Sequence, residues 1–328
     1  MKPSRLRSVL EALLGQRWPA FIWGAPGVGK STIVRAIAAE RQLPVVDLRA
    51  SLLDPTDLRG IPAIESGRAV WCPPAFLPSA DDPPGVLFLD EINAAPPLVQ
   101  ASLYQLVLDR RVGEYQLPEG WWIVAAGNRH QDRAITFRMS SALANRFVHL
   151  ELEPDLEDWR QWAVARRIDP LVVSFIALRP ALLCQEPGEG SAYPTPRSWE
   201  MASDVLSAFG GPRDCADVLP GIVGQAAAIE FGAHVKKSIS ERKMRALIAD
   251  PEHGEIPESL DGLHVLTSWL AWQASDPQVS SAAARLLSRM PPEFAVVLAR
   301  DMLKGLPAFA REPGYRAFMK QHGQLIAR

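Results

Sequence analysis

One stretch decides the fold of this chain, and it reads Phe21-Ile22-Trp23-Gly24-Ala25-Pro26-Gly27-Val28-Gly29-Lys30-Ser31-Thr32. An apolar run begins at Ala20 and leads through the glycine-rich turn into residues 31–40, whose apolar residues have helical spacing. The order is strand, loop, helix, which is typical of a phosphate-binding loop. The sequence therefore predicts a nucleotide site between the first strand and the helix that follows it.

The residue types of this loop have a physical explanation. Its glycines let the backbone curl so that N–H groups face inward at the positively polarised start of a helix. Lys30 is placed to reach the terminal phosphates, and the Ser31 hydroxyl to ligate Mg²⁺. A chance match is the alternative, and both flanking segments argue against it. We predict that the nucleotide-binding residues are Gly24, Ala25, Pro26, Gly27, Val28, Gly29, Lys30, Ser31 and Thr32.

The composition of the chain indicates its number of domains, its class of partner and its compartment. Its 328 residues, 48% of them hydrophobic, are enough for two or three domains with buried cores. The net charge of −2, with scattered basic residues, argues against nucleic acid or anionic membrane as a partner. No stretch approaches the ~20 apolar residues of a membrane span. The three distant cysteines, Cys72, Cys184 and Cys215, suit a reducing compartment, so we expect a cytoplasmic protein.

A second candidate site follows the apolar residues 86–89. Asp90 and Glu91 end this predicted strand, at the edge where ligands bind in open parallel sheets. Asp90 is expected to hold magnesium, and Glu91 to orient and deprotonate an attacking water. The alternative is a strand that happens to end in two surface acids.

A third polar residue ends another predicted strand. Residues 121–126 are apolar, and Gly127 and Asn128 follow. An amide beside the Asp90–Glu91 strand can hydrogen-bond both a γ-phosphate and the lytic water. An asparagine in an ordinary turn is the alternative, so the argument depends on the order of the motifs.

Other elements are predicted from periodicity and from turn residues. In the first half we expect a helix over Leu6–Leu14 that ends at Gly15, a strand over Leu43–Leu48, a hairpin within Ile61–Pro74 that bends at Ser66–Gly67, a helix over Pro97–Asp109 and a hairpin over Arg110–Pro118 that bends at Gly113. In the second half we expect helices over 156–166, 171–183, 198–209, 222–236, 260–274, 279–290 and 294–303. Trp159, Trp162 and Trp199 are expected to pack in a core.

Taken together, these motifs resemble those of AAA+ ATPases, and most closely the MoxR branch. The resemblance spans roughly residues 18–232 and rests on the phosphate loop, Asp54–Gly60, Leu87–Asn93, Gln100–Gln105, Ala125–Asn128, Ala142–Phe147 and Tyr193–Trp199. It implies an α/β fold in which a P-loop core, with a parallel sheet flanked by helices, is followed by an all-α lid and a C-terminal helical segment. The implied domains are 1–152 for the core, 153–250 for the lid and 251–328 for a helical extension.

The resemblance also implies roles for single residues. These are Lys30 and Ser31 for Walker A, Asp90 and Glu91 for Walker B, Asn128 for sensor 1, Arg146 for the arginine finger and Arg197 for sensor 2. An arginine finger completes the site of a neighbouring subunit, because the charge on the transferring phosphoryl group needs a donor from outside the pocket. A surface ion pair is the alternative for either arginine. Arg129, Arg133 and Arg138 compete with Arg146.

The function implied is Mg²⁺-dependent ATP hydrolysis by a homo-oligomeric ring, expected to be a hexamer, that remodels a protein substrate. By analogy the partner carries a von Willebrand factor A domain. Trp71 and Tyr115 are candidates for target contact, and the alternative is that they pin their own hairpins. Three other functions stay open: a nucleotide-dependent switch or scaffold with slow turnover, a nucleic-acid motor and, more weakly, a small-molecule kinase.

Overall fold

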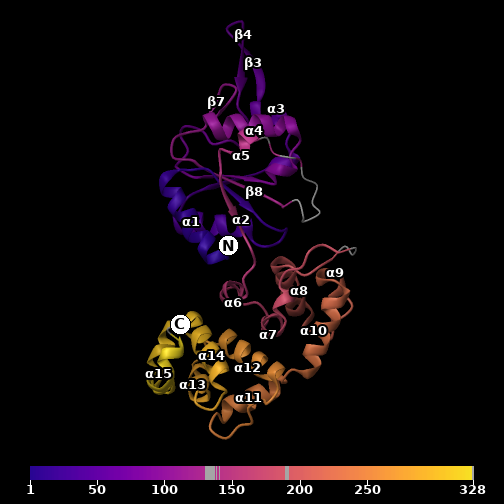
Figure 1. Cartoon of the computed structure of the whole chain (residues 1–328), viewed down its shortest axis with the longest axis vertical. Coiled ribbons are helices and arrows are strands. Elements are labelled where there is room, and N and C mark those ends of the chain that lie inside the picture. The colour runs from indigo at the N-terminus through magenta and orange to yellow at the C-terminus, as the bar shows by residue number, and fades with distance from the viewer. Residues whose placement is uncertain (130–136, 138, 140, 189–191, 327–328) are drawn as a thin grey trace. The chain divides into compact units, whose positions relative to one another are not determined.

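The computed structural model describes residues 1–129, 137, 139, 141–188 and 192–326. The chain divides into two compact units, Met1–Glu153 and Pro154–Arg328 (Figure 1). The first unit contains a sheet with helices around it, and every regular element described in the second unit is helical.

The sheet of the first unit has five parallel strands in the order β2-β5-β8-β1-β9. The strands are β1 (Ala20–Trp23), β2 (Val45–Arg49), β5 (Val86–Asp90), β8 (Trp122–Gly127) and β9 (Val148–Glu151). The central strands β5 and β8 are apolar and buried almost throughout, because helices cover both faces of a parallel sheet. This arrangement confirms the predicted α/β fold with a parallel sheet flanked by helices.

Helices and short 3₁₀ segments connect these strands. They are α1 (Pro3–Gln16), α2 (Lys30–Glu40), η1 (Ala50–Leu52), α3 (Pro55–Arg59), η2 (Ile92–Ala94), α4 (Pro97–Asp109) and α5 (Ser141–Ala144). Helix α4 has the predicted bounds. The predicted end of the first helix at Gly15 is wrong, because α1 continues to Gln16 and Arg17 takes the left-handed conformation there, with φ +58°.

Both predicted hairpins are present. Strand β3 (Ile61–Glu65) pairs with β4 (Arg68–Cys72), and β6 (Arg111–Val112) with β7 (Tyr115–Gln116). Ser66, Gly67 and Gly113 have positive φ at the bends. The β3–β4 hairpin projects from the first unit beyond α3 and α4 (Figure 1).

The aromatic residues of the hairpins are engaged within the first unit. Tyr115 is buried and its hydroxyl donates to the Pro78 carbonyl at 2.8 Å, so it pins its own hairpin. The Arg59 guanidinium lies 4.1 Å from the Trp71 ring centroid. The most exposed apolar side chains of the β3–β4 hairpin are Ile61 and Ile64, at 76% and 85% exposure.

The second unit consists of α6 (Leu156–Ala165), α7 (Pro170–Leu178), η4 (Pro180–Leu182), α8 (Pro196–Phe209), α9 (Pro220–Val223), α10 (Gln225–Lys237), α11 (Glu241–Ala249), α12 (Leu260–Trp272), α13 (Pro277–Leu286), α14 (Pro292–Gly305), η5 (Pro307–Arg311) and α15 (Pro313–Ile326). The prediction of one helix over 222–236 is wrong. Gly224, with φ +84°, separates α9 from α10, and an added Cβ there would lie 2.8 Å from the Ala192 carbonyl oxygen. Helices α11 and α15 were not predicted.

Two hydrophobic clusters fill the second unit. One surrounds Trp199 and Phe231, and it also contains Trp159 with Trp162 packed against it, as predicted for these tryptophans. The other joins residues 244–318. Leu171 packs against both clusters. The C-terminal helices therefore pack on residues 154–250 within one unit.

Candidate functional site

The predicted phosphate loop lies between the end of β1 and the start of α2, at residues 24–29. Gly27 and Gly29 have φ values of +77° and +97°, which favour glycine, and Gly29 is the N-cap of α2. Gly24 lies close to another part of the backbone, since an added Cβ would lie 3.1 Å from the Leu152 carbonyl oxygen, a tight contact. The loop thus brings backbone N–H groups to a helix N-terminus, where an anion is stabilised.

The Lys30 side chain lies over this loop. Its Nζ donates to the carbonyl oxygens of Gly24 at 2.7 Å and Ala25 at 3.0 Å, and to Asn128 Oδ1 at 2.9 Å. Asn128 directly follows β8, the neighbour of β1 in the sheet. The structure therefore brings together two residues that are far apart in the sequence and that were predicted to face the same phosphate.

Asp90 is the last residue of β5, the next strand along the sheet. Burial raises the pKa of its carboxyl, while the Glu91 N–H, which donates to Asp90 Oδ1 at 2.9 Å, and the Lys30 charge lower it. The acid is thus held close to the positive charge of Lys30.

Glu91 has a backbone conformation that is unusual for its residue type, with φ +56°. Its Oε2 accepts a hydrogen bond from Ser51 Oγ at 2.5 Å. Ser51 belongs to η1, directly after β2, and sequence reasoning did not single it out. Its position could have indicated a role in the site, because Ser51 is a short polar residue just after β2, the strand next to β5.

Asn93 is a second residue whose role sequence reasoning missed. Its side chain is 2% exposed, and Nδ2 donates to the backbone oxygen of Asn128 at 2.7 Å. A Cβ at Gly127 would lie 2.4 Å from Asn93 Oδ1, so only glycine fits beside it. Asn93 therefore fixes the backbone that carries the Asn128 amide.

Comparison with protein families agrees with this geometry. Residues 19–147 match the model of the AAA domain, dynein-related subfamily. The AAA domain match runs from β1 to just beyond α5 and includes every residue of the site described above. The first unit therefore has the P-loop fold of AAA+ proteins.

Solved structures give a weaker likeness. RuvB from Thermotoga maritima, a Holliday junction branch migration motor, is 18% identical with a TM-score of 0.35, covering 82% of this chain and 80% of the other. NtrX from Brucella abortus, in complex with ADP, is 19% identical with a TM-score of 0.35, covering 98% of this chain and 68% of the other. TM-scores this low carry no argument about function. Comparison with curated proteins gives no match.

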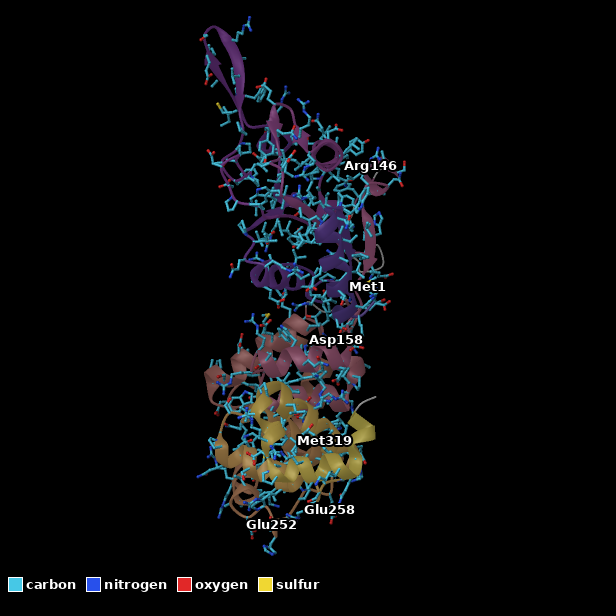
Figure 2. All side chains as sticks on the ribbon, turned by 90° about the vertical axis from the view of Figure 1, so that its left-hand side faces the viewer. Met1, Arg146, Asp158, Glu252, Glu258 and Met319 are labelled. Atoms are coloured by element: carbon cyan, nitrogen blue, oxygen red, sulfur yellow. The ribbon has the colours of Figure 1, made fainter. Side chains whose placement is uncertain are left out.

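Arg146 lies at the edge of the AAA domain match, two residues beyond α5 (Figure 2). Its side chain is exposed, and among the described residues it has no ion-pair partner. Arg129, by contrast, pairs with Glu151 of its own unit at 3.3 Å. Arg133 and Arg138 lie outside the described residues. The geometry thus favours Arg146 over Arg129 as the arginine presented to another molecule.

Arg197 belongs to the second unit, near the start of α8, and is not among the residues that the AAA domain brings together. Thr195 caps this helix, accepting from the Ser198 N–H at 3.0 Å, while Ser198 Oγ accepts from the Thr195 N–H at 2.7 Å. This capping box fixes the start of α8. The Arg197 side chain at this start is exposed.

The residues present in the AAA domain fit a magnesium site. Ser31 is the second residue of α2 and the half-buried Asp90 is the last residue of β5, and their hydroxyl and carboxylate are oxygen ligands of the kind that Mg²⁺ prefers. Within the described ranges no group of three His, Cys, Asp or Glu side chains is arranged to hold a metal. In the same part of the chain, no helix is long and apolar enough to cross a membrane.

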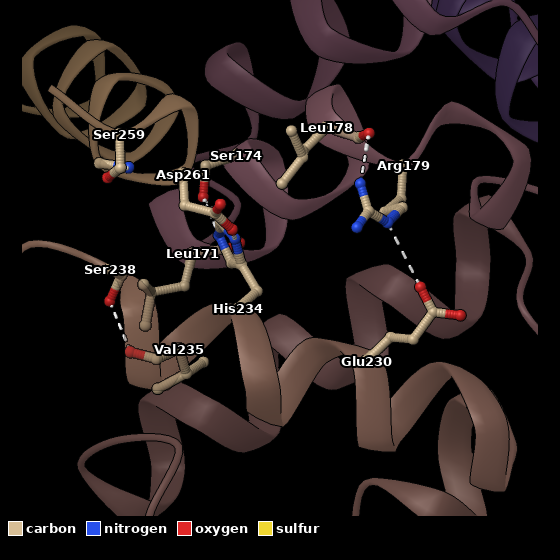
Figure 3. A network of polar contacts seen from close by, with 11 residues as sticks. Leu171, Ser174, Leu178, Arg179, Glu230, His234, Val235, Ser238, Ser259 and Asp261 are labelled. Carbon is tan, nitrogen blue, oxygen red and sulfur yellow. Dashed lines mark hydrogen bonds and ion pairs between the residues drawn. The ribbon is translucent and has the colours of Figure 1, made fainter.

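A separate polar network lies in the second unit (Figure 3). His234 Nδ1 is 2.8 Å from Asp261 Oδ1, and its Nε2 is 2.9 Å from Ser174 Oγ. This is the residue set of a hydrolase triad, but Ser174 is fully buried and no substrate reaches it. The network joins α7, α10 and α12 and is structural.

Proposed function

We propose that this protein is a MoxR-like AAA+ ATPase that hydrolyses ATP with Mg²⁺ in a ring, expected to be a hexamer. The observation that carries the proposal is the contact between Lys30 and Asn128, next to the two acids that end β5. These four residues come from three segments, the start of α2, the end of β5 and the residue after β8, and lie at one edge of the sheet, as phosphoryl transfer requires.

Each residue has a distinct role in the proposed reaction. The N–H groups of residues 24–29 and the Lys30 ammonium bind the phosphates. Water attacks the γ-phosphorus, its proton passes to the Glu91 carboxylate, and ADP leaves. Asn128 orients the water and the γ-phosphate. Ser31 and Asp90 would hold Mg²⁺, which would supply charge neutralisation at the phosphate oxygens.

Arg146 completes the site of the neighbouring subunit, so the proposed reaction needs an oligomer. Its exposure and its lack of an ion-pair partner within the described residues support this role. We further propose that Arg197 senses the γ-phosphate and couples hydrolysis to motion of the second unit. The substrate is a protein, the partner carries a von Willebrand factor A domain, and the location is the cytoplasm. The resemblance of the motifs supports these last proposals.

The test is ATP turnover as a function of protein concentration, with mass photometry on the same samples. Specific activity is expected to rise as a ring population appears. A dilute monomer that turns over ATP at the full rate would overturn the shared site.

One observation favours a second function, a nucleotide-dependent switch with slow turnover. Ser51 engages the carboxylate that would act as the base, which slows water activation for as long as the bond persists. Single-turnover kinetics separate the two functions. A switch keeps a slow chemical step even in the assembled ring, whereas the ATPase does not. A nucleic-acid motor is disfavoured by the net charge of −2.

A further inference from the structure

A chain of two hydrogen bonds connects the end of β1 with the turn that carries Arg146. Trp23 Nε1 donates to His149 Nδ1 at 2.8 Å. The other ring nitrogen of His149, Nε2, lies 2.7 Å from the carbonyl oxygen of Ala144. Ala144 is the last residue of α5, and His149 belongs to β9, which pairs with β1.

The direction of both bonds follows from the chemistry of the groups. An indole N–H can only donate, so His149 Nδ1 must accept and carries no proton. The neutral ring then has its proton on Nε2, and this N–H donates to the Ala144 carbonyl. The hydrogen bond from Trp23 therefore selects the tautomer of His149 that can donate to the Ala144 carbonyl oxygen.

The two ends of this chain lie at functionally distinct places. Trp23 directly precedes Gly24, the first glycine of the phosphate loop. At the other end, the Phe147 N–H also donates to the Ala144 oxygen, at 3.2 Å, which closes the turn that contains Arg146. The chain thus connects one subunit's own phosphate loop with the arginine that it presents to another subunit.

Aromatic packing holds the histidine ring in place. The ring centroids of Trp23 and His149 are 5.9 Å apart with an interplanar angle of 20°, and Phe21 stacks on Trp23 at 4.2 Å. Phe147 packs edge-on against Phe21 at 5.4 Å. His149 is itself exposed, so these ring contacts and its two hydrogen bonds together determine its orientation toward Ala144.

We propose that His149 is a positioning residue for Arg146, and that it fixes the arginine-bearing turn through the Ala144 carbonyl. This inference rests on the proposed function, because it takes Arg146 as a finger that acts in the neighbouring site. No contact between His149 and nucleotide is required.

The test uses mixed rings in which each subunit has one task. A donor subunit carries Glu91→Gln, so that its own site is inactive but its Arg146 is intact. An acceptor subunit carries Arg146→Ala and keeps its own site. Turnover of the mixture comes from acceptor sites completed by donor arginines. His149→Ala is then introduced into the donor or into the acceptor alone.

His149→Ala in the donor is expected to lower kcat of the mixture about fivefold, the effect of one lost hydrogen bond on a barrier, with KM for ATP unchanged. The same change in the acceptor is expected to leave turnover unaltered. The positioning role would be overturned if His149→Ala in the donor left turnover unchanged, or if turnover fell only when His149→Ala was in the acceptor. If the mixture with His149 intact shows no turnover, the proposed function itself fails.

Two conservative variants guard against simple misfolding. Gln at position 149 can keep a donor near Nε2, so His149→Gln in the donor is expected to restore most of kcat. Asn keeps only an acceptor near Nδ1, so His149→Asn should behave like His149→Ala. Rescue by Asn rather than by Gln would contradict the role of the Ala144 bond. His253→Ala is the matched control, since His253 is exposed and lies in the second unit.

Discussion

Glu91 is the residue on which the proposed chemistry depends. We predict that Glu91→Gln retains ATP binding and lowers kcat by about 10²- to 10⁴-fold, because only proton abstraction from water is removed. Single-turnover hydrolysis and nucleotide binding, measured on the same preparation, check this. Lys30→Ala is the contrasting variant. It should weaken nucleotide binding itself, since Lys30 supplies the charge at the phosphate loop. Near-normal turnover in Glu91→Gln would exclude Glu91 as the base.

Ser51 gives a second prediction at the same scale. Its hydroxyl donates to Glu91 Oε2, so one of the two oxygens that could take a proton from water is already engaged and the side chain is restrained. Ser51→Ala is expected to raise basal kcat by about two- to fivefold, the effect of one hydrogen bond, without changing KM for ATP. Steady-state kinetics without a partner protein measure this. A fall in kcat would show that Ser51 holds Glu91 in its active position instead.

At the scale of elements, α10 and α12 carry histidines that resist protonation. Burial, and after it the charge of Arg160, lowers the pKa of His264 to about 4. The ring of His264 packs edge-on against Phe294 of α14, with centroids 4.9 Å apart. Burial also lowers the pKa of His234, against the raising effect of Asp261.

The sign of the resulting pH dependence follows from proton binding. Between about pH 4 and pH 6.5 the unfolded chain binds a proton at position 264 that the folded chain does not, so stability rises with pH. We predict that the second unit loses ~1–2 kcal/mol from His264 between pH 7 and pH 4.5, after allowance for solvent screening. Thermal unfolding of the full chain and of His264→Gln over this range isolates the contribution. The same pH dependence in both proteins would refute it.

At the scale of the whole molecule, the last quarter of the chain is part of the core of the second unit. Met244 and Leu247 of α11 share a cluster with α12, α13, α14 and α15. Asp301 of α14 accepts a hydrogen bond from the buried Arg160 of α6 at 2.6 Å, and burial raises the pKa of this carboxyl. Residues 251–328 therefore stabilise residues 154–250.

We predict that a chain ending at residue 250 loses the cooperative unfolding of the second unit. The truncation removes both Asp301 and α14, which packs on α6, so Arg160 loses its ion-pair partner, and the apolar residues of the shared cluster become exposed to water. Calorimetry should show the transition of the first unit alone. A chain ending at residue 322 is the control, because it keeps Tyr315 and Phe318, the last described residues of the cluster. An unchanged second transition in the shorter chain would contradict this prediction.

The sequence alone was sufficient to predict four strands of the sheet (β1, β2, β5 and β8), the phosphate loop and the polar residues at the ends of β5 and β8, whereas the edge strand β9 was not predicted. These features depend on local patterns: an apolar strand, the glycines that turn the chain, and the residue that follows each strand. Asp90 and Asn128 lie at the same edge of the sheet because β5 and β8 pair in parallel. The break at Gly224 was missed, because it depends on the close approach of the Ala192 carbonyl.

Only the tertiary structure showed which residues hold the site together. Ser51 meets Glu91, Asn93 meets the Asn128 backbone, and Trp23 meets His149 across separations of 40, 35 and 126 residues. No local pattern encodes such pairs, because they depend on strand order and on the path of each loop. The sequence thus determined which chemical groups the site contains. The fold decided which neighbours orient them, since a hydrogen bond requires atoms within about 3 Å.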